Sequence, residues 1–204
     1  MSKIPLPTND HNLPQFQFEI LLASKSPRRQ QLFQETGFNF KIVNIDADES
    51  FDAHKTPAEI SEFLAKHKAA HYHEALKSNQ LLVTADTIVY SENNVLNKPN
   101  SEDEAFEMLS FLSGKTHQVY TGVAVKSLKS ECVFHESTEV TFKTLTQQEI
   151  WHYIKTASPM DKAGSYGVQD WMGFVGVSSI NGCFYNVMGF PMSRFWKELN
   201  YFIS

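Results

Sequence analysis

Short apolar runs of strand length recur along the chain and alternate with longer segments that begin with helix-capping residues. Runs of this length that end in turn residues are typical of strands in a folded core. The segment SENN at residues 91–94 predicts a turn that brings the third strand back onto Val95 and Leu96. Strands are predicted at residues 18–23, 38–45, 81–90, 118–127, 132–143, 173–179 and 183–188.

The helices are marked by their first residues. Ser26 before Pro27 reads as an N-cap with proline at the first helical position. Three further segments, TPAE at 56–59, SEDE at 101–104 and TQQE at 146–149, have the spacing of a capping box. Helices are predicted at residues 27–37, 56–75, 101–114, 146–156 and 193–202. Alternating strands and helices with some hairpin-short connections predict an α/β fold, with a mixed twisted sheet flanked by helices.

Length and composition narrow the class of protein. The 204 residues suit one domain, which we expect to span 18–204 after a flexible N-terminal extension at 1–17. No apolar run reaches membrane-spanning length, and the N-terminus lacks a hydrophobic signal core. Two distant cysteines fit a reducing compartment, so we expect a cytoplasmic protein without a membrane partner. The net charge of −5 disfavours a nucleic-acid polymer but permits a small polyphosphate.

The stretch LLASKSPRR at residues 21–29 is the most informative one. Cations in a first helical turn oppose the helix dipole, which favours negative charge there by about 0.3–1 kcal/mol. An anion such as phosphate, held by backbone N–H groups, serine hydroxyls and the guanidinium groups of Arg28 and Arg29, would compensate. The alternative is an ordinary surface helix start whose arginines point into water.

Four charged residues are further candidates. Asp86 lies inside the apolar run at 81–89, where a buried carboxylate is costly unless it manages a proton or a metal; otherwise it caps a neighbouring loop. Glu49, after Asp48, offers oxygen ligands for Mg²⁺ or is part of a solvated loop. Lys98 follows the predicted hairpin and could face the same cleft as Asp86, although a Lys-Pro pair by itself means little. Lys68, taken alone, reads as a surface lysine on a helix.

Other motifs contribute less. His67 and His71 have helical zinc-pair spacing, but Lys68 stands where a zinc protease motif has glutamate, so we reject that reading. The P-loop, the dinucleotide fingerprint and the serine-hydrolase elbow do not occur in the sequence. Gln169 ends a glycine-flanked loop ahead of a predicted strand, and its amide can donate and accept hydrogen bonds to a base. Trp171 could pack on a base, although core or surface packing is its commoner use.

Taken together, these segments resemble the Maf family of nucleoside triphosphate pyrophosphatases. Ordered motifs over nearly the whole chain are more specific than any one of them. They are ASKSPRR at 23–29, DE at 48–49, AKHKA at 65–69, ADT at 85–87, KP at 98–99, LSGKTH at 112–117, DKAGSYGVQ at 161–169 and GFP at 189–191.

The resemblance implies an inosine-triphosphatase-like fold with two lobes around a cleft. It also implies hydrolysis of a nucleoside triphosphate to its monophosphate and pyrophosphate, with a divalent metal cation (Mg²⁺, Mn²⁺ or Co²⁺) as cofactor, and a homodimer. Asp86 falls on the catalytic position, as general base or as metal ligand, with Glu49 as a second metal ligand. The phosphate-binding positions fall on Ser24, Arg28, Arg29, Lys68 and Lys98.

Three residues resemble the branch of the family that acts on dTTP and UTP: Arg28, Thr87 and Gln169. That activity would serve house-cleaning of nucleotide pools. The chain departs from the family pattern at four positions that bear on the ranking of substrates, namely Asn97, Asp170, Trp171 and Phe190. Two other functions compete: a nucleotide-binding regulator of cell division and septum formation without turnover, and a nucleotidyl or phosphoryl transferase that needs an acceptor.

Overall fold

The computed structural model describes residues 17–204 and shows one mixed sheet of seven strands with helices against it. The predicted extension at residues 1–17 lies outside the described residues, apart from Gln17. In chain order the elements are β1 (Glu19–Ala23), α1 (Pro27–Glu35), β2 (Phe40–Ile42), α2 (Pro57–Ala70), β3 (Gln80–Ser91), β4 (Asn94–Leu96), α3 (Glu102–Leu112), β5 (Thr116–Lys126), β6 (Glu131–Phe142), α4 (Gln147–Ala157), η2 (Pro159–Asp161), η3 (Ala163–Ser165), α5 (Trp171–Gly176), β7 (Val177–Asn181), α6 (Phe184–Met188) and α7 (Met192–Ile203).

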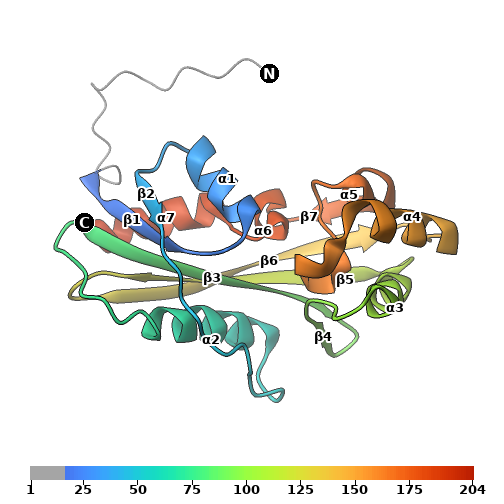
Figure 1. Ribbon diagram of the computed structural model, residues 1–204, viewed down its shortest axis with the longest axis horizontal. Helices are drawn as coiled ribbons and strands as arrows, with labels where there is room; N and C mark the ends of the chain where they lie inside the picture. The colour runs from blue at the N-terminus through green and yellow to red at the C-terminus, as the bar shows by residue number, and fades with distance from the viewer. Residues whose placement is uncertain (1–16) are drawn as a thin grey trace.

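The sheet has the order β2-β1-β3-β5-β6-β7, with β4 paired to β3 beside it. Strand β1 runs parallel to β2 and β3, whereas β3, β5 and β6 form antiparallel pairs. The long strands β3, β5 and β6 extend through the whole molecule (Figure 1). This arrangement confirms the predicted mixed α/β fold.

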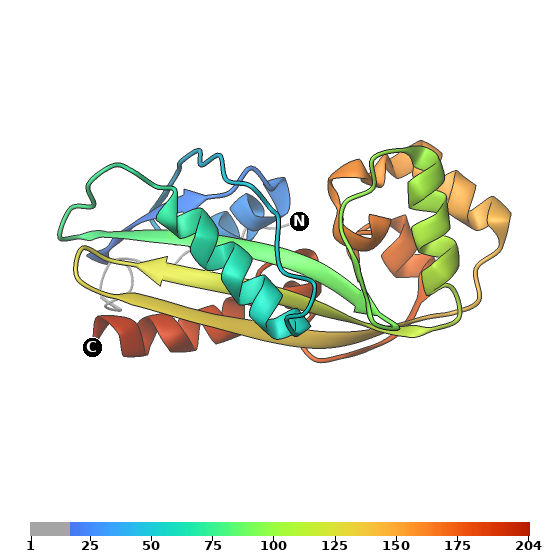
Figure 2. The ribbon, with the colours of Figure 1, turned by 90° about the horizontal axis from the view of Figure 1, so that it is seen from below.

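The helices form two groups along the sheet. In the first group, α2 covers one face of the sheet, and α1 and α7 lie on the other face. The second group consists of α3, α4 and α5, which lie together at the far end of the sheet (Figure 2). Around α1 and α7 the core is a cluster of phenylalanines; the ring of Phe33 lies 4.9 Å from that of Phe190 and 5.5 Å from that of Phe195. Phe190 is therefore a buried core residue.

Most predicted elements occur within one or two residues of their expected bounds. The turn of the hairpin between β3 and β4 has Glu92 at φ 47° and Asn93 at φ 66°, as a tight two-residue turn requires. The capping boxes at Thr56 and Thr146 are complete. The third box is incomplete, because the Glu104 carboxylate accepts a hydrogen bond from the backbone N–H of Asn100 and not from that of Ser101.

Four predicted elements were wrong in extent or type. The strand expected at 38–45 is reduced to three residues, and the helix expected to reach residue 75 ends at 70. Residues 173–176 belong to helix α5, so the strand begins only at Val177, and 183–188 contain helix α6 in place of a strand. In α6 the buried Asn186 amide donates to Val119 O and Thr138 Oγ1, contacts that outweigh local strand preference.

Candidate active site

A cleft of about 620 Å³ lies where the edge of β3 is left without a partner strand. Strand β1 pairs with β3 as far as Thr84, and β4 begins to pair only at Val89. Neighbouring residues of a strand point to opposite faces of the sheet. At this gap in the sheet, residues from both faces reach the same opening, so Asp86 and Thr87 both line the cleft.

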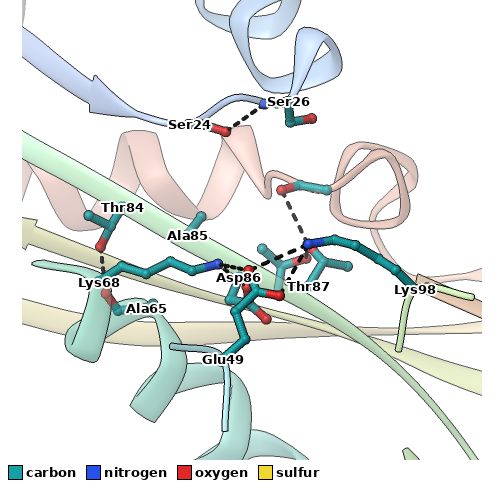
Figure 3. A network of polar contacts seen from close by, with 12 residues as sticks. Ser24, Ser26, Glu49, Ala65, Lys68, Thr84, Ala85, Asp86, Thr87 and Lys98 are labelled. Atoms are coloured by element: carbon teal, nitrogen blue, oxygen red, sulfur yellow. Dashed lines mark hydrogen bonds and ion pairs between the residues drawn. The ribbon is translucent and has the colours of Figure 1, made fainter. Parts of the chain in front are cut away.

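On the α2 side, two lysines and two carboxylates alternate (Figure 3). Lys98 Nζ lies 3.2 Å from Glu49 Oε2, and Glu49 Oε1 lies 2.8 Å from Lys68 Nζ. Lys68 Nζ also donates to Asp86 Oδ1. We call Lys98, Glu49, Lys68 and Asp86 the charged chain. Lys68 thus bridges the carboxylates of Glu49 and Asp86, and Asp86 is mostly buried with 8% of its surface exposed.

The position of Lys68 over Asp86 follows from the packing of α2 on the sheet. The buried Thr84 hydroxyl donates to Ala65 O at 2.6 Å, which ties β3 to the middle of the helix (Figure 3). On β5, Gly122 stands opposite Asp86 in the ladder, and a Cβ there would lie 2.0 Å from Ser61 O. Only glycine allows the helix to approach the sheet so closely.

The charged chain holds Glu49 in its ionised form. Burial raises the pKa of the Glu49 carboxyl, but hydrogen bonds and charge from Lys68 and Lys98 outweigh it and lower the pKa to about 2. Glu49 is therefore anionic at neutral pH. A carboxylate kept charged in a cleft is suited to pair with a cation of the protein or of a ligand.

The opposite wall is built by the loop after β1 and the start of α1. Ser24 is buried, and its Oγ accepts a hydrogen bond from the Ser26 N–H at 3.2 Å. Ser26 makes no side-chain capping bond to α1, so its hydroxyl does not occupy the N–H groups of the first turn. Arg28 reaches across the cleft, where its Nη1 donates to Asp161 Oδ2 of η2 at 2.9 Å.

Arg29 differs from Arg28 in that the protein itself occupies its guanidinium. Its Nε donates to Gly189 O at 2.7 Å, Nη1 to Ala85 O at 2.9 Å and Nη2 to Thr87 Oγ1 at 3.0 Å. Burial lowers the pKa of the Arg29 guanidinium, and the charge of Asp86 opposes that effect. Because three of five N–H donors are used, only two remain for a ligand. Arg29 therefore joins the unpaired edge of β3 to the turn after α6.

Thr87 is tied into the same set of contacts. Its Oγ1 accepts the hydrogen bond from Arg29 and shares a 2.8 Å hydrogen bond with Thr121 Oγ1. Gln169 also lines the cleft; its Oε1 is buried and has no hydrogen-bond partner among residues 17–204. A buried acceptor without a partner costs roughly 1–3 kcal/mol, so Gln169 is placed to accept a donor from a ligand.

The structure brings all nine predicted site residues into the lining of one cleft: Ser24, Arg28, Arg29, Glu49, Lys68, Asp86, Thr87, Lys98 and Gln169. Trp171, which we considered as a base-packing residue, is not among the cleft-lining residues. Its ring meets that of His152 of α4 at a centroid distance of 5.0 Å. Sequence reasoning assigned no role to Asp161 and Lys162, which also line the cleft, although both lie inside the motif at 161–169.

The cleft is more positive than the chain as a whole. Six cations line it, Lys25, Arg28, Arg29, Lys68, Lys98 and Lys162, against four carboxylates, Asp46, Glu49, Asp86 and Asp161. The chain carries a net charge of −5, so this local excess of two positive charges is a property of the site. Charge focused in a cleft attracts an anionic ligand.

The fold and the cleft thus define a mixed α/β protein whose cleft carries a local excess of positive charge. A family model described as Maf-like protein matches residues 19–202. The chain is 44% identical over 183 residues to a protein of Bacteroides thetaiotaomicron named dTTP/UTP pyrophosphatase, which covers 89% of this chain and 95% of that one. It is 46% identical over 184 residues to a Bacillus cereus (strain G9842) protein of the same name, with coverage of 90% and 95%. The chain belongs to the Maf family, as the resemblance predicted.

Among solved structures, the Ham1 protein of Staphylococcus aureus matches 61% of this chain and 71% of its own length, with 15% identity and a TM-score of 0.43. Within residues 17–204, no helix is both long and apolar enough to cross a membrane.

Proposed function

We propose that this protein hydrolyses dTTP and UTP to the monophosphate and pyrophosphate, an activity that removes unwanted nucleotides from cellular pools. The observation that carries the proposal is the charged chain at the unpaired edge of β3, opposite the start of α1. Relatives at 44% and 46% identity over most of the chain carry the name of this activity.

The charged chain is suited to exchange its partners when a triphosphate binds. The ammonium groups of Lys68 and Lys98, now paired with carboxylates, would bind phosphate oxygens. Ser24 and Arg28 on the opposite wall would bind the same group of oxygens, with the first-turn N–H groups of α1. Arg29 has two donors left for phosphate, and its larger task in our proposal is to hold Thr87 and the β3 edge.

Asp86 is the residue that we place at the reacting atoms. A water molecule attacks the α-phosphorus, the bond from that phosphorus to the bridging oxygen breaks, and pyrophosphate leaves with that oxygen. When Lys68 moves to phosphate, Asp86 Oδ1 is released to accept the proton of the water or to bind a metal ion. Both roles require an ionised carboxylate at this position.

A divalent cation fits the donors of this site. Glu49 and Asp86 lie close enough to share one ammonium group, and so close enough to share a divalent ion. Residues 17–204 contain no cluster of three or more His, Cys, Asp or Glu that would form a complete protein site. Mg²⁺ commonly uses one or two carboxylates together with substrate phosphates. We propose Mg²⁺, Mn²⁺ or Co²⁺ held by Glu49 and Asp86, which would neutralise charge on the phosphates.

We assign base selection first to Gln169, which lines the cleft. Thymine and uracil present an N–H donor between two carbonyl acceptors, and the free Oε1 of Gln169 can accept from that donor. Arg28 and Thr87 are the other two residues that we assign to selectivity. Thr87 would act through the β3 edge, since its hydroxyl is already bonded to Arg29 and Thr121.

A panel of nucleotides with separate detection of products tests the proposal. The purified protein with Mg²⁺, Mn²⁺ or Co²⁺ should convert dTTP and UTP to the monophosphate and pyrophosphate, without any acceptor. Release of orthophosphate and a diphosphate, a requirement for an acceptor, or binding without turnover would each overturn it. The last outcome would support the regulator of cell division and septum formation.

Two further properties stay predictions of the family resemblance. We expect a homodimer, which sedimentation of the full chain would test against a monomer. We also expect a cytoplasmic location, in keeping with the two free cysteines, Cys132 and Cys183.

A further inference from the structure

The hydroxyl of one buried tyrosine holds the loop that carries Gln169. Tyr153 of α4 is fully buried, and its Oη donates to Asp170 Oδ2 at 3.0 Å. The same Oη accepts the backbone N–H of Gly167 at 3.0 Å. A backbone hydrogen bond from Asp170 N to Gly167 O closes the turn at 3.1 Å. The two ends of the segment 167–170 are thus joined to each other and to α4.

Gly167 brings the Asp170 carboxylate and the Gln169 amide together. A Cβ on Gly167 would lie 2.4 Å from Asp170 Oδ2 and 2.9 Å from Gln169 Nε2. Both polar groups therefore pack over the same face of this glycine, in space that any other residue would fill. The nitrogen end of the Gln169 amide and Asp170 Oδ2 are therefore both close to one point above Gly167, without a direct hydrogen bond between them.

The orientation of this amide matters because its two ends are nearly equal in size and opposite in hydrogen-bonding character. A carboxylate attracts the positive NH₂ end and repels the oxygen, so Asp170 favours the orientation in which Nε2 faces it. Oε1 then stays on the other side, buried and without a partner among the described residues. The reverse orientation would turn a donor to the place where Oε1 now accepts.

We propose that Asp170 is a positioning residue for base selection, which fixes the Gln169 amide with Oε1 as the acceptor and so favours thymine and uracil over cytosine. Thymine and uracil have a donor at N3, whereas cytosine has an acceptor there, and a fixed acceptor on the protein discriminates between them. The inference rests on the proposed function and deepens it. It assigns a task to Asp170, one of the positions where this chain departs from the family pattern.

The charges around Asp170 fit this task. Lys162 Nζ lies 3.7 Å from Asp170 Oδ2 and 2.8 Å from Asp161 Oδ1, and its side chain is 11% exposed. This cation lies near the same carboxylate oxygen, Asp170 Oδ2, that accepts the hydrogen bond from Tyr153. The carboxylate is then held by a phenol and a cation, with Gln169 as its third neighbour.

Two substitutions test separately the charge of Asp170 and the hydrogen bonds that hold its loop. Asp170→Asn keeps the size of the side chain and removes the charge that orients the amide. Tyr153→Phe removes the hydroxyl that joins Asp170 to Gly167 and leaves the ring in the core. The matched control for Asp170→Asn is Asp103→Asn, at an exposed site in the first turn of α3. The matched control for Tyr153→Phe is Tyr201→Phe, at an exposed site of α7.

The readout is the ratio of kcat/KM for dTTP to kcat/KM for CTP, with folding checked by thermal unfolding. Asp170→Asn should lower this ratio by roughly tenfold, mainly through a higher KM for dTTP, because one matched polar contact is lost while the phosphate-binding residues are unchanged. Tyr153→Phe should lower it less, and the double variant should match Asp170→Asn, since both act through one linkage. The two controls should keep the parental ratio.

The activity of the unsubstituted protein on dTTP distinguishes a failure of the proposed function from a failure of the positioning role of Asp170. A parent that does not hydrolyse dTTP overturns the proposed function itself. If the parent prefers dTTP and the folded Asp170→Asn variant keeps the parental ratio, or loses dTTP and CTP activity by the same factor, the positioning role is overturned. If Asp170→Asn does not fold, the same criterion applies to Tyr153→Phe, and an unchanged ratio there overturns the inference.

Discussion

Arg28 and Arg29 are neighbours in one helical turn, yet the structure gives them opposite tasks. Arg28 makes one ion pair with Asp161, whose side chain is 53% exposed. Arg29 donates three hydrogen bonds, to Gly189 O, Ala85 O and Thr87 Oγ1. Replacing each with alanine should therefore separate binding from stability. From sequence alone, both arginines were expected to bind phosphate.

The magnitudes follow from these contacts. An exposed ion pair contributes about 0.2–1 kcal/mol, so Arg28→Ala should lower the free energy of unfolding by less than about 1 kcal/mol. Each hydrogen bond to a charged group contributes about 1.5–3 kcal/mol, but Arg29 is only partly buried and water replaces part of the loss. We expect about 3 kcal/mol for Arg29→Ala, which for a chain of this length lowers Tm by about 6–12 °C.

The loss of activity should not follow the loss of stability. Arg28→Ala removes a guanidinium that faces the cleft and should lower kcat/KM for dTTP about 10- to 100-fold, the effect of one charge-assisted hydrogen bond. Thermal unfolding and steady-state kinetics on the same two preparations decide the matter, with Arg29→Lys as a further variant that keeps charge but not the fork. The reasoning is refuted if Arg28→Ala lowers Tm as much as Arg29→Ala, or if Arg29→Ala unfolds at the parental temperature.

Three other predictions concern single groups. Asp86→Asn should lower kcat by at least about 100-fold while dTTP binding stays measurable by calorimetry, and near-parental kcat would contradict its assignment. Gln169→Glu should change the ranking of dTTP, UTP, CTP and 7-methyl-GTP more than it changes kcat for the best of them, so an equal loss for all four would exclude base selection. Burial lowers the pKa of His117 to about 4, against about 6.5 in an unfolded chain, so the unfolded state binds more protons between these values. Stability should fall by roughly 3 kcal/mol as the pH drops from 6.5 to 4; urea unfolding of His117→Gln should show a smaller drop, and equal drops would contradict the buried neutral imidazole.

The fold was largely predictable because its elements carry local signals. The capping residues at Thr56 and Thr146 and the turn at Glu92 and Asn93 occur where local hydrogen bonding and backbone geometry require them. Helix α6 was predicted as a strand because its stability comes from distant residues that the buried Asn186 side chain contacts. Such contacts leave no pattern in the local sequence.

The candidate site was predictable as a set of residues but not as a set of contacts. Family motifs named the nine residues, and the structure places them in one cleft. The sequence does not show that Lys68 joins Glu49 to Asp86, because the three residues come from a loop, a helix and a strand. Nor does it show that Asp170 meets Tyr153, which is 17 residues away on another element.

The most direct test of the account is the position of the oxygen that water adds. We place the attack at the α-phosphorus, beside Asp86, so hydrolysis of dTTP in ¹⁸O-labelled water should put the label in the monophosphate and leave pyrophosphate unlabelled. Mass spectrometry of the two products reads this in one experiment. Label in pyrophosphate would place the attack at the β-phosphorus and contradict the arrangement of the site that we propose.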